Sequence, residues 1–171
     1  MTGGLRLVPL AAGHLDAMDA LVRDPDVLRF TRVPEPAPPG FARDWLDRYL
    51  AGRADGSRIG FAVEDDAGAF LGLALAPSID AEAGEVELGY IVAPDARGRG
   101  VATALLRELT RWALDELRAQ RIVLLIDAEN AGSLRVAERC GYVREGVMRS
   151  AWVKQDRRAD QEIWSRLPSD S

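Results

Sequence analysis

Residues 89–103 read Gly-Tyr-Ile-Val-Ala-Pro-Asp-Ala-Arg-Gly-Arg-Gly-Val-Ala-Thr, and this stretch decides the fold. An apolar strand ends, a short loop turns at Pro94-Asp95, and two glycines open a helix. Glycine lets backbone N–H groups approach a ligand closely, and a helix N-terminus carries about half a positive charge. Arg97 and Arg99 add full charges beside these groups. The combination predicts a loop that binds a phosphate or pyrophosphate; the alternative is an arginine-rich turn that only caps a helix.

The sequence after this loop alternates between helices and apolar strands. Apolar residues at helical spacing continue to about residue 117 and predict one long helix. An unbroken apolar run at 122–126 predicts a buried strand. The remaining predicted elements are a helix at 131–139 that stops at Gly141, and two strands at about 142–153 and 160–167.

The sequence before the loop predicts helices first and then a meander of strands. The predicted elements are a strand at 5–9, a helix over 15–22 ending near Pro25, a stiff proline-rich loop at 33–40, a helix at 41–50 closed by Gly52, and strands at 59–63, 70–76 and 85–92. This order indicates a mixed α/β fold around a largely antiparallel sheet. The strands at 85–92 and 122–126 flank the long helix and should run parallel with a right-handed connection.

Length and composition limit the classes to which the protein can belong. A chain of 171 residues predicts a single domain over 1–171, and 47% hydrophobic with 29% charged residues is typical of globular proteins. No apolar run approaches the roughly 18 residues of a membrane span, and no secretory signal is visible, so we expect a cytoplasmic protein without a membrane partner. The net charge of −5 argues against nucleic-acid binding. One cysteine, Cys140, and one histidine, His14, leave no set of metal ligands, so we expect no metal.

One interpretation of the loop is a dinucleotide fingerprint. Gly98-x-Gly100-x-x-Thr103 nearly fits it, and Asp127 ends the next strand, where a ribose-binding acid would stand. The third glycine, however, is a threonine. Too few strand–helix units follow for a doubly wound sheet. A nucleotide-dependent oxidoreductase is therefore the weaker alternative.

The loop and a later segment of the chain both resemble those of a different protein family. Arg97-x-x-Gly100-x-Ala102, which follows an apolar strand, resembles the acyl-CoA loop of the GNAT N-acetyltransferase superfamily. Residues 130–142, which begin Asn-Ala-Gly-Ser and end Gly-Tyr, are similar to that family's Asn-x-x-Ser helix and the Gly-Phe or Gly-Tyr pair that closes it.

The segment 87–90, Glu-Leu-Gly-Tyr, narrows the resemblance to the RimJ/RimL-like branch, which acetylates the N-termini of ribosomal proteins. Residues 145–149 and Asp160 support it, and the resemblance covers essentially the whole chain in order. It implies a mostly antiparallel sheet of about six to seven strands, with helices on both faces and one parallel pair of strands that splay apart.

The resemblance implies acetyl-CoA as cosubstrate. In similar proteins the pantetheine arm pairs with the freed backbone of the strand at 85–92, where an N–H at Ile91 or Val92 would polarise the thioester carbonyl. Amides from Gly98 to Thr103 would hold the pyrophosphate, and the side-chain amide of Asn130 would hold the pantetheine arm. The residues predicted to bind acetyl-CoA are Ile91, Val92, Ala93, Arg97, Gly98, Arg99, Gly100, Val101, Ala102, Thr103, Asn130 and Ser133.

Two residues are predicted to carry the chemistry. Glu87 matches the family's carboxylate and is the expected general base; it shares a strand face with Glu85 and Gly89. Many relatives protonate the leaving thiolate with a tyrosine at the position of Ala137, so that route is closed here. The RimL-like branch places a serine at Ser133, whose hydroxyl can donate to the sulfur. The alternatives are a solvated strand face for Glu87 and a helix-capping role for Ser133.

The function predicted from these features is acetyl transfer from acetyl-CoA to a primary amine, by direct attack in a ternary complex. The amine is a protein N-terminal α-amine or a small-molecule amine, because the early helices and the loop at 33–40, which line the acceptor site in similar proteins, carry no decodable motif. A homodimer is one expected assembly. A non-catalytic acyl-CoA sensor is the main alternative, since it would need the loop but not Glu87 or Ser133.

Overall fold

A computed structural model describes residues 4–170. Its strands are β1 (Leu5–Pro9), β2 (Ile59–Asp65), β3 (Phe70–Asp80), β4 (Glu85–Val92), β5 (Arg121–Asp127), β6 (Val143–Lys154) and β7 (Arg157–Arg166). Its helices are α1 (Leu15–Leu21), α2 (Pro25–Phe30), α3 (Phe41–Asp55), α4 (Val101–Asp115) and α5 (Ala131–Arg139), with short 3-10 turns at Ala12–His14 and Pro94–Ala96. Within residues 4–170, no helix is long and apolar enough to cross a membrane.

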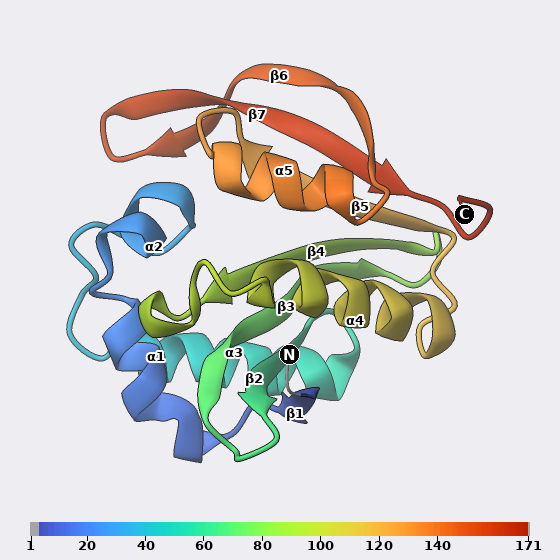
Figure 1. Ribbon diagram of the computed structural model, residues 1–171. Coiled ribbons are helices and arrows are strands. Elements are labelled where there is room, and N and C mark those ends of the chain that lie inside the picture. The colour runs from blue at the N-terminus through green and yellow to red at the C-terminus, as the bar shows by residue number, and fades with distance from the viewer. Residues whose placement is uncertain (1–3, 171) are drawn as a thin grey trace.

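The seven strands form one sheet in the order β1-β2-β3-β4-β5-β7-β6 (Figure 1). Every neighbouring pair is antiparallel except β4 and β5, which run parallel and are joined through α4. The predicted mixed sheet, mostly antiparallel with one parallel pair, is confirmed.

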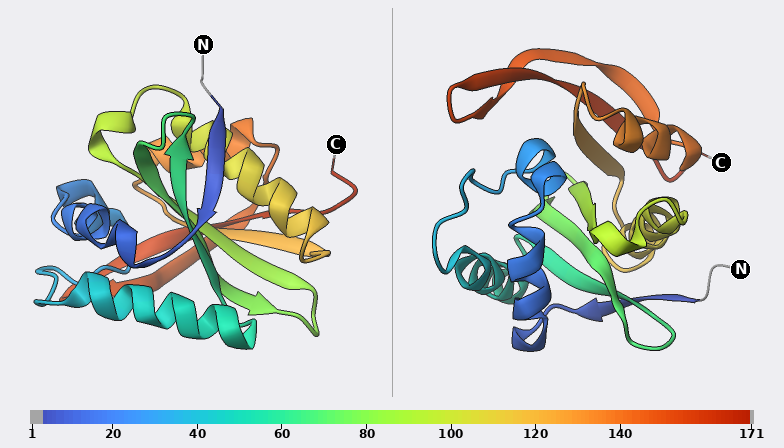
Figure 2. Two further views of the ribbon diagram at one scale, coloured as in Figure 1. Left: turned by 90° about the horizontal axis from the view of Figure 1, so that it is seen from below. Right: turned by 60° about the vertical axis from the view of Figure 1, so that its left-hand side comes forward.

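The parallel pair separates after three residues. Glu85–Glu87 of β4 pair with Arg121–Val123 of β5, and beyond these residues β5 pairs only with β7. A bulge in β3 between Leu75 and Ser78 lies opposite the point of separation, and a bulge bends its strand. The sheet therefore divides into a half with β1 to β4 and a half with β5, β7 and β6, as the right-hand view of Figure 2 shows.

Arg121 holds the two halves together at the closed end of the split. Its Nε donates to Glu85 of β4 at 2.9 Å, and its Nη1 donates to Glu145 of β6 at 2.6 Å. The hydroxyl of Ser165 in β7 donates to the same Glu145 oxygen at 2.6 Å. The hydrogen bonds from Arg121 and Ser165 lower the pKa of Glu145 to about 2. This network joins the four strands β4, β5, β6 and β7 at the paired end of the split.

Each face of the sheet carries its own buried cluster. Apolar residues of α4 at helical spacing, including Leu105 and Leu109, pack with α5 and strand residues such as Ile122 on one face. On the other face, α1, α2 and α3 pack residues such as Met18 and Leu46 against the sheet. Figure 2 shows α4 and α3 on opposite sides of the strands, so the predicted helices on both faces are confirmed.

Three elements differ from expectation. Pro25 begins α2 rather than ending a region of helix, because Asp24 caps it by accepting the N–H of Val27 at 3.0 Å, and proline suits the first helical position. α3 passes through Gly52 and ends at Asp55, because the C-cap is Gly56, which has the left-handed φ of 79°. The third difference is that β3 runs to Asp80, four residues past its expected end.

Candidate active site

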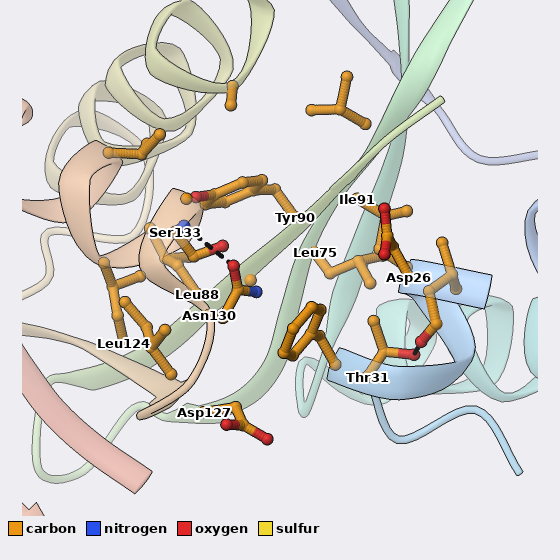
Figure 3. A pocket seen from close by; sticks show the side chains of 18 of the residues that line it. Asp26, Thr31, Leu75, Leu88, Tyr90, Ile91, Leu124, Asp127, Asn130 and Ser133 are labelled. Carbon is orange, nitrogen blue, oxygen red and sulfur yellow. Dashed lines mark hydrogen bonds between the residues drawn. The ribbon is translucent and has the colours of Figure 1, made fainter. Parts of the chain in front are cut away.

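A cavity of about 940 Å³ lies where β4 and β5 separate. Its walls come from α2, α3, β4, β5, α5 and the glycine loop that precedes α4, so both halves of the sheet contribute. In Figure 3, Tyr90 of β4, Ser133 of α5 and Asn130, the N-cap of α5, lie on one side of the cavity, whereas Asp26 of α2 and Thr31, its C-cap, lie on the other.

The residues predicted from sequence converge on this cavity. All of them line it except Ala93 and Arg99. The N–H of Ala93 donates to the carbonyl of Leu71 in β3 at 2.9 Å, so it is committed to the sheet. Arg99 is exposed outside the cavity wall. The binding roles themselves stay predictions.

The glycine loop has the conformation that an anion site requires. Gly98 and Gly100 have φ of 71° and 78°, in the left-handed region that favours glycine. An added Cβ at either residue would meet no atom within 4 Å. Gly100 is the N-cap of the 15-residue helix α4, and no side chain caps that end. The loop therefore presents glycine backbone and the positive end of a helix to the cavity.

Arg97 is held by acidic residues of the α2 region. Its Nη2 lies 2.6 Å from Asp24 Oδ1, its Nη1 lies 3.1 Å from Asp26 Oδ2, and its Nε donates to the carbonyl of Val92 at 3.2 Å. Burial acts to raise the pKa of Asp24, but hydrogen bonds from Arg97 and Val27 outweigh it and leave the pKa below its ordinary value. Arg97 thus fixes α2 to the loop. Because Asp24 and Asp26 already neutralise its positive charge, Arg97 would attract a phosphate less strongly than an unpaired arginine.

Strand alternation identifies which backbone groups of β4 face the split. Neighbouring residues of a strand direct their N–H and C=O groups to opposite edges. The N–H of Ala93 bonds Leu71 of β3, so Ile91 also faces β3. Val92 faces the split, consistent with the bond from Arg97 to its carbonyl. Of the two residues proposed from sequence, Val92 therefore has the N–H that can reach a ligand.

Glu87 lies at the point where β4 leaves β5. It is the last β4 residue paired with β5, and its side chain is 20% exposed at the cavity wall. Arg32, which follows α2, donates to Glu87 Oε1 from Nη2 at 3.1 Å, and its own side chain is 65% exposed. The Glu87 carboxylate is therefore partly buried and ion-paired, whereas on a solvated strand face it would be exposed and unpaired.

Asn130 and Ser133 share the start of α5. The Oδ1 of Asn130 accepts the backbone N–H of Ser133 at 3.1 Å, which caps the helix (Figure 3). The Asn130 amide nitrogen has no hydrogen-bond partner within residues 4–170, so it remains able to donate to a ligand. Because the cap uses the backbone of Ser133, the serine hydroxyl is not needed for it.

Tyr90 lines the cavity and was not singled out from the sequence. Its ring extends from β4 toward Ser133 (Figure 3), and its buried hydroxyl has no hydrogen-bond partner in the described part of the chain. Burial raises the pKa of Tyr90 to about 12, so the phenol keeps its proton at neutral pH. The sequence feature that could have identified Tyr90 as a lining residue is its place at the end of the Glu-Leu-Gly-Tyr segment.

A second group of lining residues forms another wall of the cavity. We call this wall the acceptor end. It comes from α3 and the turn after it, and consists of Phe41, Trp45, Arg48, Tyr49 and Arg58. Positions 41, 45, 48 and 49 repeat at helical spacing, which gives them one shared face. That periodicity was visible in the sequence, but it predicted a core face as readily as a binding wall.

Cys140 is a core residue. It is 3% exposed, and its sulfur lies 3.6 Å from the carbonyl oxygen of Thr103. Burial raises the pKa of the Cys140 thiol, which disfavours the nucleophilic thiolate. Across residues 4–170, no three His, Cys, Asp or Glu side chains are grouped to hold a metal ion.

The whole fold matches solved structures. The spermidine N-acetyltransferase of Vibrio cholerae, solved with CoA and spermine, superposes with a TM-score of 0.86 at 24% identity, covering 97% of this chain and 96% of that one. The microcin self-immunity acetyltransferase MccE, solved with acetyl-CoA and AMP, gives a TM-score of 0.85 at 18% identity, with coverage of 97% and 96%. At these identities the likeness concerns the fold.

Sequence comparison identifies the family. The putative ribosomal N-acetyltransferase YdaF of Bacillus subtilis is 29% identical over 124 residues, which are 72% of this chain and 65% of that protein, slightly under two thirds of its length. The spermidine N(1)-acetyltransferase of Vibrio cholerae is 30% identical over 86 residues, half of each chain. Residues 4–143 match the acetyltransferase (GNAT) domain family. The chain therefore belongs to the GNAT acetyltransferase family.

Proposed function

We propose that this protein transfers the acetyl group of acetyl-CoA to a primary amine, by direct attack of the amine in a ternary complex. The observation that carries the proposal is the juxtaposition of three features in one cavity. These are the freed edge of β4, the paired carboxylate of Glu87 at the start of that edge, and the glycine loop with the α4 N-terminus. Acetyl-CoA supplies an activated thioester with a thiolate leaving group.

The backbone and one side chain would position the donor. N–H groups of the glycine loop and the first turn of α4 would hold the pyrophosphate. The Val92 N–H would donate to the thioester carbonyl and stabilise the oxyanion as it forms. The Asn130 amide nitrogen would donate to the pantetheine arm while its oxygen keeps the α5 cap. These contacts align the carbonyl carbon with the acceptor beside Glu87.

Two side chains would move protons. Glu87 would accept a proton from the acceptor amine, directly or through water, so that the nitrogen lone pair can attack the carbonyl carbon. A carbon–nitrogen bond forms, the nitrogen loses its second proton to water, and the carbon–sulfur bond breaks, which leaves a neutral amide and a thiolate. Ser133 would donate its proton to that thiolate and regain one from solvent. The hydrogen bond from Arg32 to Glu87 Oε1, at 3.1 Å, would hold this carboxylate at the cavity wall.

The acceptor class and the assembly remain part of the proposal. The relatives are named for ribosomal and spermidine acetylation, and the RimJ/RimL-like resemblance supports a protein N-terminal amine as one candidate. A single domain over 1–171, a cytoplasmic location and a homodimer are likewise proposed. A structural neighbour, the Vibrio cholerae spermidine N-acetyltransferase, has been solved as a dodecamer.

The decisive experiment is an amine panel in which released CoA thiol is measured. It should include peptides with free N-termini, polyamines, amino acids and their amides. Turnover with any amine supports the enzyme, whereas acetyl-CoA binding without turnover on the whole panel would favour a sensor. In parallel, acetyl-CoA should raise the melting temperature more than NAD at equal concentration. Equal stabilisation by NAD would favour the dinucleotide interpretation.

A further inference from the structure

Two arginines at the acceptor end have no acidic partner. Arg48 and Arg58 both line the cavity. Within residues 4–170, no carboxylate oxygen lies within the 4.0 Å of an ion pair from either guanidinium. Asp55 is near enough to Arg58 that, after the hydrogen bonds from Ser57, the charge of Arg58 also lowers the pKa of Asp55, whose Oδ1 accepts the N–H of Ser57 at 2.9 Å.

The carboxylates that line the cavity are already paired. Asp26 bonds Arg97 at 3.1 Å, Glu87 bonds Arg32 at 3.1 Å, and Asp127 bonds Arg157 at 3.1 Å. No further Asp or Glu of residues 4–170 lines this cavity. The acceptor end therefore carries uncompensated positive charge, against the net charge of −5 of the whole chain.

Arg58 is directed into the cavity by the helix it crosses. A Cβ at Gly52 would lie 2.0 Å from Arg58 Cγ and 2.8 Å from its Cδ, so only glycine leaves room for this path. The guanidinium carbon then lies 5.9 Å from the ring centre of Tyr49. Because the stem of Arg58 is confined, its charge is placed before any ligand binds, which lowers the entropic cost of binding.

Arg48 and Tyr49 complete the wall beside this charge. The guanidinium carbon of Arg48 lies 5.4 Å from the ring centre of Phe41, on the same helix. Tyr49 is 5% exposed, and burial raises its pKa to about 12; the charges that act on it are those of Arg58, Glu87 and Arg32. Glu87 and Arg58 therefore both lie near Tyr49, and Arg48 lies one residue away on the same helix.

We propose that the acceptor carries an anionic group, a carboxylate or a phosphate, in addition to the amine that is acetylated. Arg48 and Arg58 bind the anion with charge-assisted hydrogen bonds, while Glu87 accepts the proton of the amine. A polyamine lacks such a group and would place a second cation near the arginines. This inference rests on the proposed function and specifies its substrate class.

The test compares amines that differ only in the anionic group. One pair is a dipeptide with a free C-terminal carboxylate and the same dipeptide as its amide; a second pair is O-phosphoethanolamine and ethanolamine, and spermidine is included. For the anionic member of a pair, we expect kcat/KM at least about tenfold higher, the gain of one good ionic contact. The two pairs separate a carboxylate site from a phosphate site.

Variants of the arginines connect that preference to the acceptor end. Arg48→Gln and Arg58→Gln should each lower kcat/KM for the anionic acceptor much more than kcat/KM for its neutral partner, so that the preference for the anionic acceptor is reduced. Gly52→Ala should act like Arg58→Gln, because its methyl group displaces the arginine. Arg53→Gln is the matched control, since Arg53 is also on α3 but packs over Phe61 outside the cavity, 5.3 Å from the ring centre.

Binding measurements keep this inference separate from the proposed function. Calorimetry of each pair with the CoA-bound protein detects anion preference even without turnover. Tighter binding of the anionic members, lost in the arginine variants, supports the inference. Equal binding of anionic and neutral members, or better turnover with spermidine, overturns it while leaving an acetyltransferase in place. Absence of turnover with every amine contradicts the proposed function alone.

Discussion

Gly40 and Gly100 begin the two 15-residue helices, α3 and α4, with nearly identical backbone: φ is 79° at Gly40 and 78° at Gly100. An added Cβ at either position would meet no atom within 4 Å. Gly100 lines the cavity, whereas Gly40 does not. The same substitution at the two glycines therefore separates the loss of stability from a strained backbone from the loss of affinity for a bound phosphate.

Gly100→Asp should weaken CoA binding at least about tenfold, or about 1.4 kcal/mol. The aspartate places bulk and a repelling charge where the pyrophosphate would meet the backbone. It should also cost about 1–2 kcal/mol of stability, because a non-glycine residue is strained at this φ. Gly40→Asp should show the same stability loss with unchanged CoA affinity. Calorimetry and urea unfolding measure both, and unchanged CoA binding by Gly100→Asp would refute this placement of the phosphate.

Glu87→Gln should lower turnover by about a hundredfold, the usual range for loss of a general base. Acetyl-CoA affinity should barely change, since the loop and Asn130 are untouched. The deficit should shrink as pH rises, because more of the acceptor amine is then already neutral. Steady-state kinetics over pH test this prediction.

Glu85→Gln provides the control for this variant. Glu85 is on the same strand face two residues earlier, outside the large cavity, where it bonds Arg121 at 2.9 Å. Its loss should leave turnover at the wild-type value. A Glu87→Gln protein with wild-type turnover at neutral pH would exclude Glu87 as the base.

Ser133→Ala should reduce turnover less than Glu87→Gln, and by a factor that does not depend on pH. The serine is expected to act on the leaving thiolate, which departs readily without much help. The α5 cap should survive, because Asn130 accepts the backbone N–H of residue 133 rather than the hydroxyl. Thermal unfolding should therefore match the wild type. A loss of turnover that disappears at high pH would instead place Ser133 in the deprotonation of the amine.

Acid should weaken the network that closes the split. The folded pKa of Glu145 is about 2, below its ordinary 4.5, so the unfolded chain binds a proton first as pH falls. The stabilising contribution of Glu145 is complete above its ordinary pKa and is lost as pH decreases from about 4.5 toward 2. The stability difference between wild type and Glu145→Gln should accordingly shrink between pH 6 and pH 3 in urea unfolding.

Glu82→Gln serves as the reference for that pH series. Glu82 is exposed in the turn before β4 and forms no ion pair within residues 4–170. The difference in the free energy of unfolding between Glu82→Gln and the wild type should stay constant between pH 6 and pH 3. An equally constant difference for Glu145→Gln would show that the network contributes no charge-dependent stability.

The sequence by itself determined the periodic elements and the parallel pairing of the two strands that flank α4. The spacing of apolar residues predicted α4, and the alternation of residues with intervening turns predicted the meander. Two glycines two positions apart predicted the glycine loop. Each of these signals depends only on residues a few positions apart in the sequence. The convergence of Glu87, Gly100 and Ser133 on one cavity was also predictable, but only through the family resemblance of their segments.

The tertiary structure alone decided how charges meet across long sequence separations. Arg97 is 73 residues from Asp24, and Arg32 is 55 residues from Glu87, so no local pattern reveals that these pairs form. Strand register likewise selected Val92 over Ile91 as the residue facing the split. The path of Arg58 over Gly52 depends on how the turn after α3 returns across the helix. Such contacts depend on packing between distant segments, which composition and periodicity do not encode.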